Sequence, residues 1–232
     1  MPRDVYLALG DGIPAGLGAS HPGLSFVRHV TSFVKERSIA RRTVVIAQPG
    51  LTVKHLFEVV RTIQPAFWET VRIATLSIGS ADLARLLKPR RLTLDGNPFP
   101  PRAVIKKADE FGYHTDQLFQ LIRERHLPHV LVTTLYNPFP SCPPAVRFVE
   151  GMNGIRRDCA AYHHFEIVDL DDAFRDNEAY LIQGYRTGDW PDLLQPVNRP
   201  MFPNNAGHKL IAHLITRHLG QRFRAKSRRS GP

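Results

Sequence analysis

The chain has 232 residues, enough for one α/β domain with a substantial buried core, and a formal net charge of +10. No apolar run is long enough to span a membrane, two cysteines without a Cys-x-x-Cys pattern make no disulfide framework, and no secretory signal precedes the first strand. We therefore expect a cytoplasmic protein without a membrane span.

Strand-like and helix-like segments alternate along the chain, as is typical of a parallel sheet covered by helices. Five short apolar runs are predicted as buried strands, at residues 5–9, 43–47, 71–77, 129–135 and 165–168. Helices are predicted at residues 24–36, 53–63, 81–87, 102–125, 144–163 and 205–220. The helix at 102–125 carries an apolar stripe of Val104, Ala108, Phe111, Leu118, Leu121 and Ile122.

Residues 88–101 and 169–203 are predicted as long and mostly irregular. The segments rich in proline and aromatic residues, 88–101 and 176–203, could roof a cleft or offer a partner surface. The second segment carries several aromatic residues, among them Tyr180, Tyr185 and Trp190. We expect a single domain over residues 1–220 and a disordered basic tail over residues 221–232.

The first predicted strand is followed by Gly10-Asp11-Gly12 and a loop of small residues. This arrangement resembles the first block of the SGNH/GDSL hydrolases, in which Gly-Asp-Ser follows a buried strand and the serine is the nucleophile. Gly12 stands where that serine is expected. Asp11 corresponds to a family aspartate whose role is mainly structural.

Two further blocks resemble the same family. Gly50 follows the second strand and matches the glycine whose N–H helps to form the oxyanion hole. Gly79, Ser80, Ala81 and Asp82 follow the third strand in place of the family's Gly-x-Asn-Asp, so Ala81 replaces the asparagine.

The last block of the family reads Asp-x-x-His-Pro-Asn before Gly-His and an apolar helix. This chain keeps that frame from Arg199 to Ala212, but Arg199 stands for the aspartate and Phe202 for the histidine. The four blocks occur in the family's order, and the similarity extends from about Val5 to Leu219.

The resemblance implies an α/β fold: a three-layer α/β/α sandwich around a five-stranded parallel sheet of order 2-1-3-4-5, as in flavodoxin. Such sheets bind ligands beyond the carboxyl ends of their strands. Gly12, Gly50, Ala81 and Asn137 all follow strands and are expected at that edge.

These substitutions remove the parts that a serine hydrolase needs, namely a nucleophile, a base, a carboxylate that orients the base, and oxyanion donors. We predict no catalytic residues, only degenerate positions at Gly12, Ala81, Arg199 and Phe202. Losing the nucleophile alone costs about 10⁶ in rate in a comparable enzyme.

Two functional hypotheses follow. The first is a non-catalytic protein that binds a small acyl or anionic ligand, or a protein partner, in the old active-site cleft. Its expected ligand-binding residues are Asp11, Gly12, Gly50, Ala81, Asn137, Arg199 and Phe202. The second is a divergent esterase, lipase or acylhydrolase with relocated groups, such as Asp11 acting on water.

The basic charge comes mainly from arginine, including the pairs Arg41-Arg42, Arg90-Arg91 and Arg156-Arg157. We interpret it as a solvated surface, because no nucleic-acid motif or repeat accompanies it, and we do not expect a nucleic-acid partner. A third hypothesis is salt-sensitive binding to an anionic surface through Arg222–Arg229.

No cofactor or metal site is expected. His208, His213 and His218 are spaced five apart, which does not place them on one helical face at the spacing of metal ligands. His208 belongs to the family's terminal helix and is expected to cap or pack that helix.

Overall fold

The computed structural model describes residues 3–87 and 101–229 of the chain. The expected loop at residues 88–101 therefore lies, apart from its last residue, outside the described residues. None of the helices in the two described ranges has the length and hydropathy needed to cross a lipid bilayer.

Five parallel strands form one sheet of order β2-β1-β3-β4-β5, which confirms the expected α/β fold and strand order. The strands are β1 (Val5–Gly10), β2 (Arg42–Ala47), β3 (Val71–Ser77), β4 (Val130–Thr133) and β5 (Glu166–Val168). At the carboxyl end of β1, Gly10 pairs with Ala47 on one side and Ser77 on the other. The loops that follow the first three strands therefore begin side by side.

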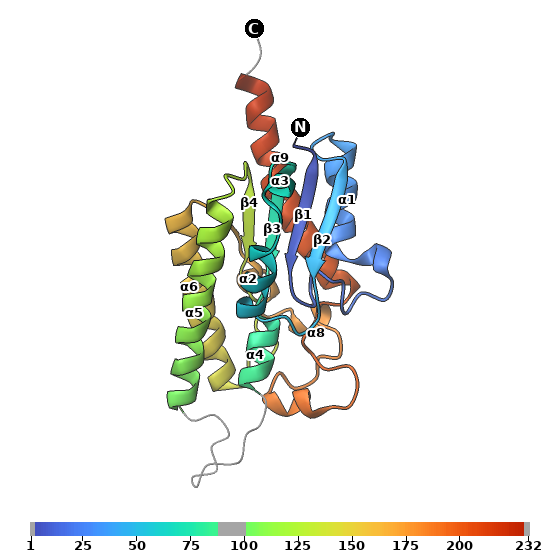
Figure 1. Cartoon of the computed structure of the whole chain (residues 1–232). Helices are drawn as coiled ribbons and strands as arrows, with labels where there is room; N and C mark the ends of the chain where they lie inside the picture. The colour runs from blue at the N-terminus through green and yellow to red at the C-terminus, as the bar shows by residue number, and fades with distance from the viewer. Residues whose placement is uncertain (1–2, 88–100, 230–232) are drawn as a thin grey trace.

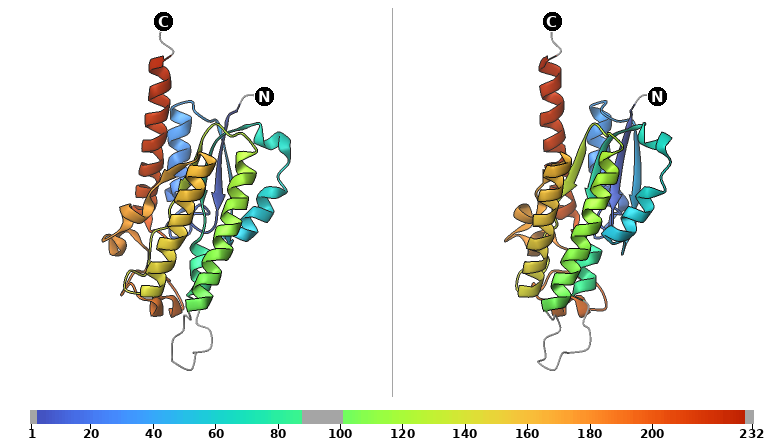
Figure 2. Two further views of the ribbon diagram at one scale, coloured as in Figure 1. Left: turned by 90° about the vertical axis from the view of Figure 1, so that its left-hand side faces the viewer. Right: turned by 60° about the vertical axis from the view of Figure 1, so that its left-hand side comes forward.

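Helices cover both faces of the sheet (Figures 1 and 2). One layer contains α1 (Phe26–Glu36) and α9 (Asn205–Arg229), which pack on each other. The opposite layer contains α2 (Val53–Arg61), α5 (Pro101–Arg123) and α6 (Pro143–His163), with α5 between the other two. The short helices are α3 (Pro65–Trp68), α4 (Ser80–Leu86), α7 (Leu170–Phe174) and α8 (Glu178–Leu181), and 3₁₀ turns lie at η1 (Pro22–Leu24) and η2 (Trp190–Leu194).

Burial follows the apolar pattern of the sequence. The interior strand β1 is buried along its whole length, whereas the edge strand β2 is half-buried to exposed. Of the stripe expected on α5, Phe111, Leu118 and Ile122 are buried and the other members pack against the core. The packing of these helices on the sheet holds the carboxyl ends of the strands in place.

The final helix is longer than the sequence pattern indicated. Helix α9 continues through Gly220 to Arg229, where a disordered tail was expected. Arg222 Nε lies 2.9 Å from Glu166 Oε1, and the Phe223 ring packs edge-on against His129 at 5.0 Å between centroids. These contacts with the body of the domain, and the absence of proline between Gly220 and Arg229, explain why the helix continues.

Candidate functional site

Asp11 joins the loop after β1 to the loop after β3. Its side chain is fully buried, and Oδ2 accepts hydrogen bonds from the Gly79 N–H (2.9 Å), the Ser80 N–H (2.8 Å) and the Ser80 hydroxyl (2.8 Å). Oδ1 accepts from the Ile13 N–H at 3.2 Å. Burial raises the pKa of Asp11, although these hydrogen bonds favour its carboxylate form. Both carboxylate oxygens therefore bind protein donors already.

A buried arginine forms a hydrogen bond with the loop that follows β3. Arg156 on α6 is only 1% exposed, and its guanidinium donates to the backbone oxygen of Ile78 and to Asn153 Oδ1 (3.3 Å). Burial lowers the pKa of Arg156 to about 10, against the opposing effect of the Asp11 carboxylate. The interpretation of the Arg156-Arg157 pair as solvated surface is thus wrong for Arg156, whereas Arg157 is exposed.

The aromatic ring of Phe202 lies directly against Gly12. A Cβ atom placed on Gly12 would stand 2.5 Å from Phe202 Cε1 and 3.0 Å from Leu17 Cδ1. Gly12 is not among the glycines with positive φ, so its backbone conformation is open to other residues. The neighbouring side chains, and chiefly the Phe202 ring, are what exclude a side chain at position 12.

Several contacts fix the segment that carries Phe202. The Tyr136 hydroxyl, fully buried, donates to the backbone oxygen of Met201 at 2.9 Å, and the Gln183 N–H donates to the backbone oxygen of Phe202 at 2.9 Å. Gly18 has a φ of 91°, and a Cβ atom there would come within 3.0 Å of Phe202 Cβ. The loop after β1 can approach this segment only because residue 18 is a glycine.

The other expected cleft residues differ in their surroundings. Gly50 is exposed, has a φ of 80°, and a Cβ atom on it would meet nothing within 4 Å. Ala81 is 8% exposed in the first turn of α4, beside Ser80. Arg199 is exposed, its Nε donates to the Gln195 backbone oxygen at 2.9 Å, and it forms no ion pair with a described residue.

Asn137 follows β4. Its Oδ1 accepts from the Phe139 N–H at 2.9 Å, which closes the turn after β4. Asn137 also lines a hollow of about 380 Å³ together with Asp171 and Arg175. Neither Gly12 nor Phe202 is among the described residues that line this hollow.

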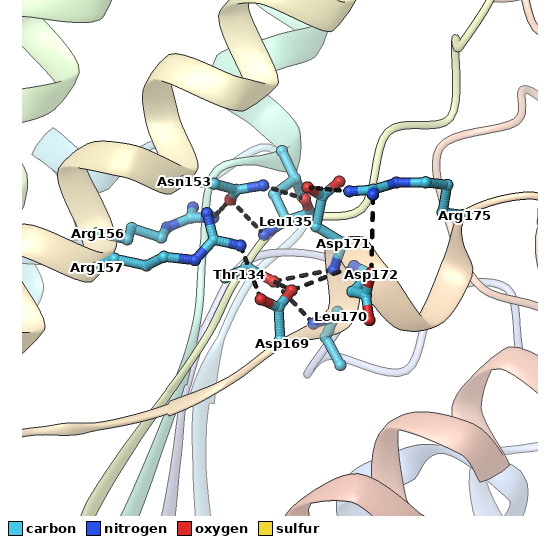
Figure 3. Close-up of polar contacts among 10 residues, drawn as sticks. All are labelled: Thr134, Leu135, Asn153, Arg156, Arg157, Asp169, Leu170, Asp171, Asp172 and Arg175. Carbon is cyan, nitrogen blue, oxygen red and sulfur yellow. Dashed lines mark hydrogen bonds and ion pairs between the residues drawn. The ribbon is translucent and has the colours of Figure 1, made fainter.

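A polar network joins the segments that follow β4 and β5 (Figure 3). Thr134 Oγ1 accepts from the N–H groups of Leu170 (2.7 Å) and Asp171 (3.0 Å) and donates to Asp169 Oδ1 (3.0 Å). Arg157 donates to the other Asp169 oxygen at 2.8 Å. The network satisfies the first N–H groups of α7, so its role is to fix the loop.

His208 packs at the start of α9, as expected. Its Nδ1 accepts from the Phe26 N–H at 3.2 Å, and its Nε2 lies 3.0 Å from the backbone oxygen of Leu17. Burial lowers the pKa of His208 to about 4. Within residues 3–87 and 101–229, no group of three His, Cys, Asp or Glu side chains has the geometry to hold a metal ion.

Comparisons with known proteins agree with this architecture. The chain is similar to the lipase Lip_vut3 from a goat rumen metagenome (18% identity, TM-score 0.73, covering 92% of this chain and 96% of that one). It is also similar to Axe2, an acetylxylan esterase from Geobacillus stearothermophilus (17% identity, TM-score 0.67, covering 94% and 95%). A third similar structure is the lipase/acylhydrolase from Enterococcus faecalis (18% identity, TM-score 0.57, covering 94% and 96%).

At these identities the structural likeness establishes the fold, which is that of the SGNH hydrolases. No curated protein sequence matches the chain significantly. A family model, by contrast, matches residues 8–210, which is most of the chain. On this match, the chain belongs to the GDSL-like lipase/acylhydrolase family.

Proposed function

We propose that this chain is a non-catalytic member of its family, which binds a small acyl or anionic ligand, or a protein partner, at the carboxyl edge of the sheet. One observation carries the proposal, the contact between Phe202 and Gly12. A nucleophile and its base must lie within hydrogen-bond reach of each other. Direct contact between these two residues supports matching Gly12 to the family's serine and Phe202 to its histidine.

The side-chain chemistry of the matched residues also supports a non-catalytic protein. Glycine has no atom that can attack a carbonyl carbon, and a phenyl ring cannot accept a proton. Ala81 offers no side-chain donor, and the loss of one oxyanion donor costs about 10²–10³ in rate. These positions therefore supply neither the nucleophile nor the base that the mechanism requires.

The alternative, a hydrolase that uses Asp11 to activate water, requires a carboxylate oxygen that can reach the water. Asp11 is fully buried, and its two oxygens accept four hydrogen bonds from the protein. Activating a water molecule would require breaking one of these bonds. This environment suits a structural role for Asp11.

The charge of Arg199 favours a ligand with an anionic group, because Arg199 forms no ion pair with a described carboxylate. The space around Gly50 is open. Guanidinium groups bind carboxylates and phosphates through paired hydrogen bonds. We therefore place the ligand's anionic group near Arg199.

The test is hydrolysis of p-nitrophenyl acetate and butyrate by the wild type and by Asp11→Ala, with a protein-free blank. We expect both proteins to remain at the blank rate, and circular dichroism checks that the variant is folded. A wild-type rate well above the blank would refute the proposal. Loss of that rate in a folded Asp11→Ala variant would then establish the alternative mechanism.

A second experiment rebuilds the family's residues. Gly12→Ser alone should not produce esterase activity, because residue 202 provides no base. The combined variant Gly12→Ser, Ala81→Asn, Arg199→Asp, Phe202→His should hydrolyse the same esters above the blank. Robust activity from Gly12→Ser alone would mean that Phe202 does not correspond to the family's histidine.

A further inference from the structure

A second hollow, of about 390 Å³, is lined by residues of α2, α4, α5 and α6. Figure 1 shows where these four helices lie. We call it the helix-side hollow. Neither Gly12 nor Phe202 lines it. Its lining residues are Thr52, Val53, Lys54, His55, Asp82, Arg85, Lys107, Glu110, Phe111, His114 and Phe148. Its volume is at the lower end of the range for small-molecule sites.

Among the described residues of this lining, cations outnumber carboxylates, three to two. Lys107 Nζ pairs with Glu110 Oε2 one turn along α5, so these two charges offset each other. Lys54 and Arg85 are exposed, and neither forms an ion pair with a described residue. Arg85 donates only to a backbone oxygen, that of Gly50, at 3.2 Å. Two positive side chains thus remain available at the mouth of the hollow.

Asp82 is the other carboxylate among the described residues of the lining, and burial disfavours its charged form. Its Oδ2 accepts a hydrogen bond from the Val53 N–H at 3.1 Å. Burial raises the pKa of Asp82 to about 6, so its negative charge is held at a cost near neutral pH. The side chain forms no ion pair with Lys54 or Arg85, although the positive charge of Arg85 lies near enough to lower the pKa of Asp82.

Two imidazoles also line the hollow, and each lies close to a polar side chain. His55 Nδ1 lies 2.7 Å from the hydroxyl of Thr52, and His114 Nδ1 lies 3.3 Å from Gln117 Oε1. The apolar part of the lining is aromatic and comes from Phe111 and Phe148, both nearly fully buried. The lining of the hollow thus combines exposed positive side chains with two buried aromatic ones.

We propose that the helix-side hollow binds a small molecule through a carboxylate or phosphate group held by Arg85 and Lys54, with its apolar part against Phe111 and Phe148. Arginine binds such groups through two parallel hydrogen bonds, and lysine adds a point charge. The carboxylate of Asp82 opposes this binding, because it places a like charge beside the anion. The proposal does not depend on whether the chain is catalytic.

The test is titration with inorganic phosphate and with sodium butyrate, in a buffer free of other oxyanions and at constant chloride concentration. Binding is followed by calorimetry and by amide chemical shifts. Arg85→Gln should weaken binding at least about tenfold, a loss of about 1.4 kcal/mol, and circular dichroism checks that the variant is folded. Asp82→Asn should tighten binding severalfold, an effect that unfolding cannot produce.

Arg61→Gln is the matched control, because Arg61 lies on α2, is exposed, and is not part of the lining. Its affinity should equal that of the wild type. Preference for phosphate or for butyrate identifies which kind of anionic group the hollow selects. The proposal is overturned if neither probe binds saturably at millimolar concentrations, or if Arg85→Gln and Arg61→Gln bind equally well.

Discussion

The imidazole of His208 donates a hydrogen bond from Nε2 to the backbone oxygen of Leu17, across 3.0 Å. The two residues belong to opposite ends of the chain, His208 to the start of α9 and Leu17 to the loop after β1. Since Nδ1 accepts from the Phe26 N–H, the neutral tautomer with its proton on Nε2 satisfies both partners. The family's terminal Gly-His thus fastens the last helix to the first loop.

The first prediction concerns acid stability. The unfolded state binds a proton on His208 near pH 6.5, whereas the folded state binds it only near pH 4. The contribution of His208 is therefore present above pH 6.5 and is lost as the pH falls towards 4. A shift of this size corresponds to about 3 kcal/mol. Denaturant unfolding at several pH values should show a shallower fall in the free energy of unfolding for His208→Gln.

His213→Gln is the control for that measurement, because His213 is exposed on the same helix. It should reproduce the wild-type dependence on pH. Equal slopes for the wild type and His208→Gln between pH 6.5 and 4 would contradict the assignment.

The second prediction concerns the anchor of the segment that carries Phe202. Tyr136→Phe leaves the Met201 carbonyl without its buried donor, which should cost about 1–3 kcal/mol in the free energy of unfolding. Tyr180→Phe, at a tyrosine 72% exposed, should change the same quantity by less than about 0.5 kcal/mol. Urea denaturation of the three proteins compares them, and equal stabilities would contradict the expectation.

The third prediction tests whether the Phe202 ring excludes a side chain at position 12. Gly12→Ser should destabilise the wild type by about 1–3 kcal/mol, because the new atoms overlap the ring. The same change should cost much less in a Phe202→Ala background, so the double-mutant cycle should give a clear coupling energy. Gly151→Ser, where a Cβ atom meets nothing within 4 Å, should cost nothing. Additive effects of the two substitutions would show that the ring is not the obstacle.

The fourth prediction compares two glycines of positive φ at the edge of the sheet. Gly79→Ala and Gly50→Ala both strain the backbone, by about 1–3 kcal/mol each. Only at Gly79 does the new Cβ also clash with the Arg156 guanidinium and with Met152 Cε. Thermal unfolding should therefore show the larger loss of stability for Gly79→Ala, and the reverse order would be inconsistent with a close contact at Arg156.

The sequence predicts the sheet well because each strand is an apolar run flanked by breakers. The third strand, Val71–Ser77, is predicted with its observed bounds. The strand order came from the family resemblance and is confirmed. The predicted end of the last helix, at residue 220, is wrong, because α9 continues to Arg229. Only tertiary contacts, such as the packing of the Phe223 ring against His129, reveal this continuation.

Side-chain placement was less predictable. Arg156 and Arg157 look alike in the sequence, but Arg156 lies four residues from buried Met152 and buried Ala160, on the inner face of α6. This spacing of four residues along a helix is the sequence signal that places Arg156 on the buried face. No local periodicity indicates the contact between Gly12 and Phe202, which are far apart in the chain. Only the resemblance of their two blocks to the family's serine and histidine blocks implies that they lie close together.

The direction of α9 has a practical consequence. The helix begins at Asn205, beside the carboxyl edge of the sheet, and runs back past the opposite edge, where β1 starts at Val5 (Figure 1). An affinity tag, fluorophore or immobilising linker attached after α9 would thus project from the side of the molecule opposite the candidate site. Surface-tethered binding assays can therefore present that site to the solution unobstructed, with the protein held by its carboxyl end.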